Sequence, residues 1–346
     1  MVEQRYFKLS DIFKIKNSKS IDKNKLKQES GNFPYITQTG LNNGVAKFIC
    51  NQGIEKLNSG NVITVCIDTH EVFYQSYDYY STQNVMRLEY KQLNKYKAIF
   101  VIALLKKIFD QKFSYGYKST LKRISNLEIK LPSTPNGNPD WEFMESYIRE
   151  QYREVVQERI EELKKKKPDA PTMLRDIEEI KTTADFLLGQ VFPTITRGIQ
   201  ISKRNRKPGP LPYISASLLN HGEADFISVD EKYIYKDCLT VPFIGGKNCT
   251  FYHDGEFVPS SDVAVLQNEN FDKHIYVFLI GILNVIMQKY SFGYKASIER
   301  LQKQTIPLPI TSDGKPDWEF MSDYIKTQSQ IVFEKELKRL KSKLDE

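Results

Sequence analysis

Two short segments combine glycine, tyrosine and lysine in a pattern that suits contact with phosphate. They are Gly116-Tyr117-Lys118 and Gly293-Tyr294-Lys295, and each stands just before a predicted short helix. Glycine lets the backbone approach a phosphate closely, and a lysine ammonium can pair with its charge. In the structural alternative, the glycine supplies an unusual φ and the tyrosine packs against the helices. The sequence leaves both interpretations open.

Basic residues form two further clusters at corresponding places in the chain. One contains Lys14, Lys16, Lys19, Lys23, Lys25 and Lys27, and the other contains Lys203, Arg204, Arg206 and Lys207. The net charge of +7 suits a polyanionic partner when the cations cluster in this way. A charge run is usually only a solvated face, but its recurrence in the repeat makes binding an equally good interpretation. The polar and aromatic segments 69–84 and 245–261 can reach phosphates and base edges.

The motifs of common nucleotide- and metal-dependent enzymes are missing from the sequence. It contains no G-x-x-x-x-G-K-[ST], no G-x-G-x-x-G, no [DNS]-P-P-[YF] and no H-E-x-x-H. The 4 cysteines and 4 histidines lack the spacing of metal ligands, so we expect no cofactor and no metal. We see no secretory signal, and the apolar run 275–287 is too short to span a bilayer. We therefore expect a cytoplasmic protein without a membrane partner.

The sequence contains an internal repeat, in which one unit occurs twice. Residues 114–148 and 291–325 align without gaps at an offset of 177, with 18 of 35 positions identical. Residues 33–49 match 211–227 at an offset of 178, whereas 50–90 and 228–265 match poorly. The sequence therefore indicates a tandem duplication that kept its framework while particular segments diverged.

Each unit has the same predicted order of elements. Short strands are expected at 61–65, 71–77, 84–90, 238–241 and 248–253, followed by buried helices at 94–113 and 271–290. A short helix, a proline-flanked extended piece and a long amphipathic helix come next. Pro139 and Pro316 are expected at the first position of the long helices, and the Trp and Met of PDWEFM should anchor their bases. The apolar stripe along each long helix needs a partner, most simply the other long helix.

The predicted fold class is α+β. We expect a tandem duplication of a mixed α/β domain followed by a long helix, with the two helices pairing as an antiparallel coiled coil. The predicted bounds are 1–138 and 191–315 for the domains, 139–167 and 316–346 for the helices, and 168–190 for a linker that could include a short helix.

The whole plan resembles the specificity (S) subunits of restriction–modification systems. The resemblance is carried by PYI[TS] after a basic loop, by an [IL]x[IL]P element, and by a helix opening G-x-P-D-W-E-F-M-x-x-Y-I. The duplicated plan is similar to type I (HsdS-like) subunits, and the helix opening and length are closer to type IIB (BcgI-like) subunits. The resemblance implies two target recognition domains that each read half of a bipartite double-stranded DNA site. It also implies spacer helices, a non-catalytic chain, and partner subunits that supply methyltransferase and endonuclease activity.

On this interpretation the expected DNA contacts come from the basic loops, the polar segments and the Gly-Tyr-Lys motifs. They are Lys16, Lys19, Lys23, Lys25, Thr37, Gln38, Tyr74, Gln75, Tyr77, Gly116, Tyr117, Lys118, Lys203, Arg204, Arg206, Lys207, Ser215, Ser217, Lys247, Tyr252, Gly293, Tyr294 and Lys295. Two alternatives stay open: a nuclease or DNA methyltransferase with atypical motifs, and a scaffold protein that does not bind DNA.

Overall fold

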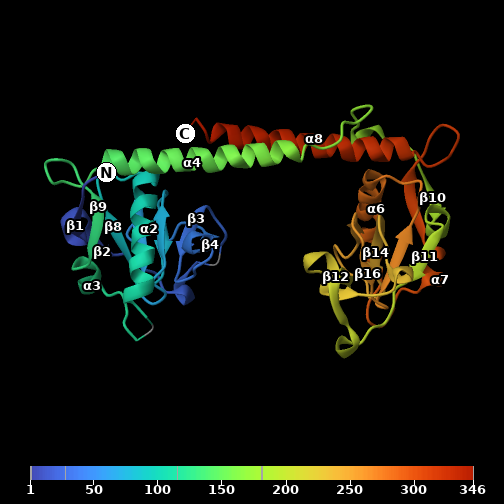
Figure 1. Cartoon of the computed structure of the whole chain (residues 1–346), viewed down its shortest axis with the longest axis horizontal. Helices are drawn as coiled ribbons and strands as arrows, with labels where there is room; N and C mark the ends of the chain where they lie inside the picture. The colour runs from blue at the N-terminus through green and yellow to red at the C-terminus, as the bar shows by residue number, and fades with distance from the viewer. Residues whose placement is uncertain (1, 28, 115, 181, 346) are drawn as a thin grey trace. The chain divides into compact units, whose positions relative to one another are not determined.

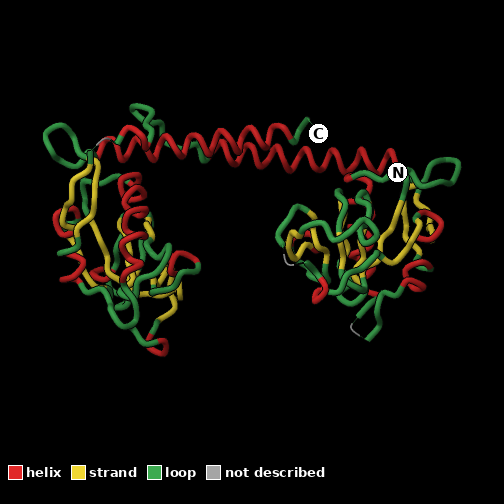
Figure 2. The backbone as a smooth tube through the Cα atoms, turned by 180° about the vertical axis from the view of Figure 1, so that it is seen from behind, coloured by secondary structure: helices red, strands yellow, loops and turns green. Residues whose placement is uncertain are grey.

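The computed structural model of the chain describes residues 2–27, 29–114, 116–180 and 182–345. Its residues fall into two units, Met1–Glu158 and Arg159–Glu346. The long helix α4 (Trp141–Lys165) begins in the first unit, and the long helix α8 (Trp318–Ser342) lies in the second (Figures 1 and 2).

The first unit is built on a four-stranded antiparallel sheet of order β2-β8-β5-β6. Its strands are β2 (Lys14–Asn17), β8 (Val85–Glu89), β5 (Val62–Cys66) and β6 (Val72–Gln75). A smaller sheet has the order β4-β3-β7, from β4 (Val45–Ile49), β3 (Phe33–Ile36) and β7 (Tyr80–Ser81). The first and last strands, β1 (Gln4–Lys8) and β9 (Glu128–Pro132), pair with each other in antiparallel fashion.

The second unit repeats this topology strand for strand. Its larger sheet has the order β11-β17-β14-β15, from β11 (Thr194–Arg197), β17 (Val263–Gln267), β14 (Cys238–Pro242) and β15 (Phe251–His253). Its smaller sheet has the order β13-β12-β16, from β13 (Glu223–Ser228), β12 (Lys207–Ile214) and β16 (Val258–Pro259). The strands β10 (Thr183–Leu187) and β18 (Thr305–Pro309) pair like β1 and β9. The predicted duplication is thereby confirmed in three dimensions.

One helix packs on the large sheet of each unit and closes its core. These helices are α2 (Lys95–Lys112) and α6 (Lys273–Ile286), which bury residues such as Leu105 and Leu283 (Figure 1). The other α-helices are short: α1 (Leu9–Ile12), α3 (Leu121–Ser125), α5 (Leu188–Val191) and α7 (Ile298–Gln302). Single 3-10 turns include η1 (Lys23–Lys25) and η4 (Lys203–Asn205), which carry part of the two basic clusters.

The long helices start two residues later than predicted, at Trp141 and Trp318 rather than at Pro139 and Pro316. The Asp140 carboxylate accepts a hydrogen bond from the backbone N–H of Phe143, and Asp317 accepts one from Phe320, so these aspartates are the N-caps. The prolines precede the caps, and the prediction that they occupy the first helical position was wrong. Met144 and Met321 are fully buried, as the anchoring role of PDWEFM requires.

The segment expected to be a linker, 168–190, contains framework of the second unit. Residues 183–187 form β10. Few identities with the first unit mark this segment: Phe186, Leu188 and Phe192 match Phe7, Leu9 and Phe13. These six side chains pack in or against the hydrophobic cores of their units. This burial stabilises β10 in the second unit. The possible helix in 173–181 is reduced to the 3-10 turn η3 (Ile177–Glu179).

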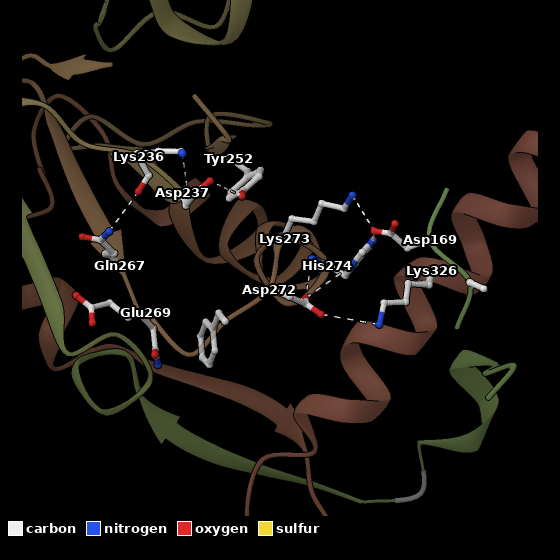
Figure 3. Close-up of a pocket in the computed structure, with 13 residues that line it drawn as sticks. Asp169, Lys236, Asp237, Tyr252, Gln267, Glu269, Asp272, Lys273, His274 and Lys326 are labelled. Atoms are coloured by element: carbon white, nitrogen blue, oxygen red, sulfur yellow. Dashed lines mark hydrogen bonds and ion pairs between the residues drawn. The ribbon is translucent and has the colours of Figure 1, made fainter. Parts of the chain in front are cut away.

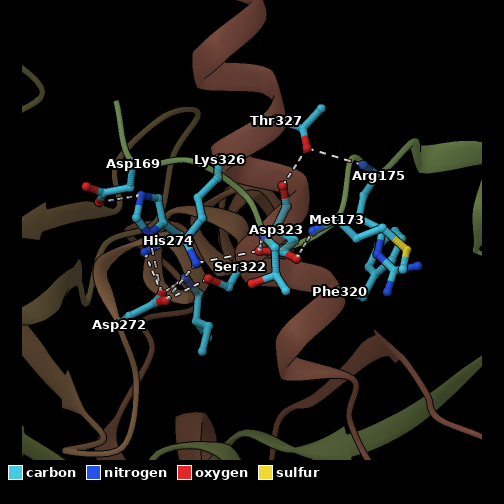
Figure 4. A network of polar contacts seen from close by, with 12 residues as sticks. Asp169, Met173, Arg175, Asp272, His274, Phe320, Ser322, Asp323, Lys326 and Thr327 are labelled. Atoms are coloured by element: carbon cyan, nitrogen blue, oxygen red, sulfur yellow. Dashed lines mark hydrogen bonds and ion pairs between the residues drawn. The ribbon is translucent and has the colours of Figure 1, made fainter. Parts of the chain in front are cut away.

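The segment just before η3 is bound to α8 within the second unit. The buried carboxylate of Asp323 accepts hydrogen bonds from the backbone N–H groups of Thr172 (3.0 Å) and Met173 (2.8 Å) (Figure 4). Burial acts to raise the pKa of Asp323, but these hydrogen bonds and the Lys326 ammonium 3.6 Å away hold it below its usual value. This strap therefore fixes the chain as it enters the second unit.

Across the described residues, none of the helices is long and apolar enough to cross a membrane.

Candidate nucleic-acid interface

In the first unit, four loops meet around the carboxylate of Asp68. The ammonium of Lys118 lies 2.6 Å from Asp68 Oδ1, and Asn84 Nδ2 donates to Asp68 Oδ2 at 3.0 Å. Gln38 Nε2 donates to the Asn84 carbonyl at 2.6 Å, while Gln38 Oε1 accepts from the Asp68 N–H at 3.4 Å. The hydrogen bond from Lys118 is the main reason why the pKa of Asp68 is lowered. We call Gln38, Asp68, Asn84 and Lys118 the Asp68 cluster.

The backbone around this cluster is held in uncommon conformations. His70 and Asn84 both have left-handed φ values, 61° and 62°. The hydroxyl of Ser119 donates to the Ile67 carbonyl at 3.2 Å and lies 3.1 Å from His70 Nδ1. Because such strain tends to collect at functional sites, this end of the sheet is a candidate binding surface.

A basic groove adjoins the Asp68 cluster. It is an open cavity of about 370 Å³ whose lining includes three lysines against two acids, together with Gln83. The charged residues of the lining are Lys25, Lys27, Lys56, Asp22 and Glu55. The carbonyl of Gln83 accepts a hydrogen bond from Gln38 Nε2 at 3.2 Å, which joins the groove to the cluster. Lys19 and Lys23 are also exposed near this groove, as their places beside Ser20 and in η1 require. The structure thus brings the first basic loop, Gln38 and Lys118 together.

The Gly-Tyr-Lys segments form tight turns after the C-terminal ends of α2 and α6. Reciprocal backbone hydrogen bonds join Ser114 with Tyr117 and Ser291 with Tyr294. The φ of Gly293 lies outside the left-handed region, and no described heavy atom lies within 4 Å of a Cβ placed on Gly116 or Gly293. At Gly293 the alternative that the glycine supplies an unusual φ is therefore wrong. Space beside both glycines remains for a ligand.

In the second unit the same framework presents different side chains. The backbone N–H of Ala296 donates to the Phe243 carbonyl at 2.8 Å, which joins the Gly-Tyr-Lys turn to the loop 244–248. That loop carries the exposed Lys247, and among the described residues Lys295 makes no ion pair with a carboxylate. Gly245 is required there because a Cβ would lie 1.9 Å from the Met287 carbonyl oxygen.

The comparison with known families decides what kind of chain this is. The sequence model of the type I restriction modification DNA specificity domain matches residues 1–165 and 181–341. The chain belongs to this family. It is a specificity subunit of a restriction–modification system with DNA recognition domains in tandem.

Two individual proteins are similar to this chain, one in sequence and one in fold. The chain is 29% identical over 338 residues to a specificity subunit of Heyndrickxia coagulans, S.BcgI of a type II restriction enzyme, with 96% of each chain covered. The crystal structure of a type I restriction-modification S subunit from M. genitalium has a similar fold, with a TM-score of 0.56 at 15% identity. That alignment covers 99% of this chain and 92% of that one.

Some residues predicted to bind DNA already have hydrogen-bond or ion-pair partners within the first unit of the specificity subunit. Gln75 is only 4% exposed, and its Nε2 donates to the Asn43 carbonyl and to Thr64 Oγ1 at 3.1 Å each. Its predicted contact with DNA is wrong, because its side chain points into the protein from β6. Tyr74 donates to Asn61 Oδ1 at 2.9 Å, and Lys16 lies 3.3 Å from Glu89 Oε2.

Tyr74 and the 78% exposed Tyr77 lie away from the Asp68 cluster. Together with Lys95 they line a cavity that runs along α2 as far as Lys106, whereas the Gly-Tyr-Lys turn follows the C-terminal end of α2. The structure therefore does not bring all predicted contacts of the first unit to one place.

The same division occurs in the second unit of the specificity subunit. Tyr252 donates to Asp237 Oδ1 at 3.3 Å and lines an open cavity of about 830 Å³ with Lys273 and His274 at the N-terminal end of α6 (Figure 3). Burial, followed by the Asp237 charge, raises the pKa of Tyr252. Tyr252 thus lies away from Lys295, which follows the C-terminal end of α6.

The side chain of Arg206 braces the fold through three contacts. Its Nη1 lies 3.2 Å from Asp225 Oδ2, its Nε donates to the Ile201 carbonyl, and its guanidinium stacks 4.4 Å from the Tyr213 ring centroid. These contacts give Arg206 a structural role, and its predicted contact with DNA stays a prediction. The neighbouring Lys203, Arg204 and Lys207 are exposed.

The two segments after the PYI strands keep the same turn in both units. The backbone N–H groups of Thr37 and Ser215 donate to the carbonyls of Gly44 and Gly222 at 2.9 and 2.8 Å. Ser217 Oγ accepts from the Leu219 N–H at 3.1 Å and so helps to hold this turn. Thr37, Ser215 and Ser217 are all partly exposed, at the loops that lead away from β3 and β12.

Groups with the chemistry of a reactive centre are scattered or buried. Within the described part of the chain, no three His, Cys, Asp or Glu side chains are grouped so that they could hold a metal ion. Burial raises the pKa of the Cys66 thiol to about 11 and that of Cys238 to about 12, so both stay protonated at neutral pH.

Proposed function

We propose that this specificity subunit reads a bipartite site in double-stranded DNA, with one half-site for each unit. The observation that carries the proposal is one loop framework with different side chains at equivalent places. The first unit presents the Asp68 cluster beside its Gly-Tyr-Lys turn, and the second presents the loop of Gly245, Gly246 and Lys247. Since base identity is read by side-chain donors and acceptors, the two half-sites should have different sequences.

The exposed lysines and arginines around these loops would hold the DNA backbone. Lys19, Lys23 and Lys25 serve the first half-site, and Lys203, Arg204 and Lys207 serve the second. Such contacts position the protein on the duplex without reading sequence. The open space beside Gly116 and Gly293 supports a close backbone approach to phosphate there.

In this proposal α4 and α8 pair antiparallel and set the unread gap between the half-sites. Each helix has 25 residues and is therefore about 37 Å long, close to one turn of duplex DNA. Within the second unit, the pKa of Glu336 on α8 is lowered mainly by Arg339, with a smaller contribution from Arg159 near the end of α4. Ile160 and Leu340 are also buried, as an apolar seam would require.

Methylation and cleavage are assigned here to partner subunits of the same system, and the complex to the cytoplasm, where its DNA lies. The assignment is supported by the absence of methyltransferase and phosphate-loop motifs from the sequence. The purified chain should therefore transfer no methyl group from S-adenosylmethionine to DNA, and should cut no DNA with Mg²⁺, until partners are added. Turnover by the chain alone would contradict the assignment.

An exchange of units tests the proposed function. Residues 183–309 are replaced by residues 4–132, so that both positions carry the first unit, and the reciprocal exchange serves as the control. The modified motif is then sequenced in cells that carry the partner subunits. We expect one half-site to become a second copy of the other, at an unchanged gap. A motif in which both halves change, or a motif without a gap, would contradict the proposal.

A further inference from the structure

A large aromatic side chain stands at the tip of the Gly-Tyr-Lys turn in the second unit. Phe292 is 81% exposed, and its turn is closed by hydrogen bonds between the backbones of Ser291 and Tyr294 at 3.0 and 3.1 Å. Single exposed apolar residues are common and need no explanation. The surroundings of Phe292 are what make this one informative.

The turn rests on a stack of flat groups that keeps it rigid. The ring of Tyr294 lies parallel to that of the buried Tyr290, with centroids 5.6 Å apart and planes at 10°. The guanidinium of Arg300 lies 4.6 Å from the Tyr294 centroid and also donates to the Lys295 carbonyl. Such a support limits the ordering of the turn backbone that binding would otherwise cost.

The first unit has the same stack, although the loops around it have diverged. Phe113 and Tyr117 stack with centroids 5.9 Å apart, and the Arg123 guanidinium lies 3.7 Å from the Tyr117 centroid and donates to the Lys118 carbonyl at 2.7 Å. The sequence places Tyr115 where the second unit has Phe292, and Tyr115 lies outside the described residues. Both turns therefore have an aromatic residue at this position.

The charges around Phe292 suit a polyanion. The ammonium of Lys295 lies 5.2 Å from the Phe292 ring centroid, and Arg300 flanks the same turn. The turn is joined to the loop of Lys247 through the hydrogen bond from Ala296 to Phe243. Proteins that kink DNA insert an apolar side chain between base pairs while nearby cations hold the phosphates.

We propose that Phe292 is a wedge that enters the duplex between two base pairs of the second half-site and kinks it there. Lys295 pairs with the phosphate beside the opened step, and the Tyr290–Tyr294–Arg300 stack keeps the ring in position. The proposal rests on the proposed DNA-reading function. It adds that the second unit favours sequences in which this base step is easily kinked.

The test uses the complex with its partner subunits and duplexes that carry the mapped site. 2-Aminopurine is placed at each position of the second half-site in turn, and bending is followed by energy transfer between dyes at the duplex ends. The wild-type complex should unstack one step and bend the DNA. Phe292→Ala should abolish both signals and weaken specific binding roughly 5- to 100-fold. Phe292→Leu should keep most of the bend, since leucine is also an apolar wedge.

The matched control is Tyr6→Ala, which removes an aromatic side chain that is 69% exposed on β1. It should leave binding and bending unchanged. If the wild-type complex does not bind the mapped site, the proposed function fails. If it binds without unstacking a step, or if Phe292→Ala still kinks the DNA, the wedge alone is overturned. Loss of subunit assembly in Phe292→Ala, with the kink retained, would also overturn the wedge and make the tip a protein contact.

Discussion

The Lys118 ammonium lies 2.6 Å from the Asp68 carboxylate, and Lys295 at the equivalent place in the second unit has no acidic partner among the described residues. The two Gly-Tyr-Lys turns are therefore electrostatically different, although their backbones are alike. A phosphate near Lys118 also meets the negative charge of Asp68, whereas a phosphate near Lys295 meets the cation alone.

The first prediction follows from this difference. Asp68→Asn should increase non-specific DNA affinity severalfold and steepen its salt dependence by about one unit, because Lys118 then acts as a full phosphate contact. Lys295→Met should weaken binding, and Lys118→Met should weaken it less. Fluorescence anisotropy at several salt concentrations measures all three effects. Equal losses from the two lysine variants would contradict the interpretation.

A second prediction distinguishes residues that contact DNA from a residue that stabilises the fold, within the basic cluster of the second unit. Charge reversal at Lys203, Arg204 and Lys207 should weaken binding to all sequences and make the salt dependence shallower by up to about three units. Reversal at Arg206 should instead lower the thermal midpoint of unfolding, since it removes the ion pair of 3.2 Å with Asp225 and turns a second carboxylate toward it. The idea is wrong if Arg206→Glu alters only binding.

The third prediction concerns the distance between the recognition units. An insertion of four residues after Glu158 adds about one turn and about 6 Å to α4, which keeps its apolar stripe in register. The gap in the modified motif should lengthen by about two base pairs, with both half-sites unchanged. An insertion of two residues rotates the stripe by about 200° and should impair folding or assembly. An unchanged gap in the four-residue variant would show that the helices do not set it.

The fourth prediction is a pH dependence of stability that originates at His253. Its ring lies 2.8 Å from Thr240 Oγ1 and 4.4 Å between centroids from Phe257, and burial, aided by the nearby His221, lowers its pKa to about 4. The unfolded chain binds this proton more readily, so stability present above pH 6.5 is lost as the pH falls toward 4. The slope should approach about 1.4 kcal/mol per pH unit. Thermal melts of His253→Gln should show a flatter dependence over that range.

Patterns in the sequence predicted many of the helices and strands, because these depend mainly on residues that are close together in the chain. The repeat and the long helices could be found from identity and periodicity, and the anchoring Met144 and Met321 followed from the same motif. The strand β10 was missed because its pairing with β18 depends on residues more than a hundred positions away. Only three identities mark it in the repeat, at Phe186, Leu188 and Phe192.

The candidate site was predicted less well, for a related reason. Residue type alone does not reveal whether a polar side chain already has a partner in the fold. Arg206 is bound by Asp225, 19 residues away, and Gln75 by Asn43, 32 residues away. Asp68, the centre of the first cluster, was overlooked because no counterpart acid marks it in the second repeat. A search for charged residues at positions that differ between the repeats would have found it.

The pairing of the first and last strands of each unit has a consequence for inheritance. Lys8 is opposite Glu128, and Leu187 is opposite Thr305. In each recognition unit, the strands where the chain enters and leaves therefore lie side by side. A crossover in the gene that exchanges the intervening codons keeps those junctions whole. If each unit reads its own half-site, as proposed, new sequence preferences can arise by recombination in a single generation, without gradual remodelling of the strands β1, β9, β10 and β18.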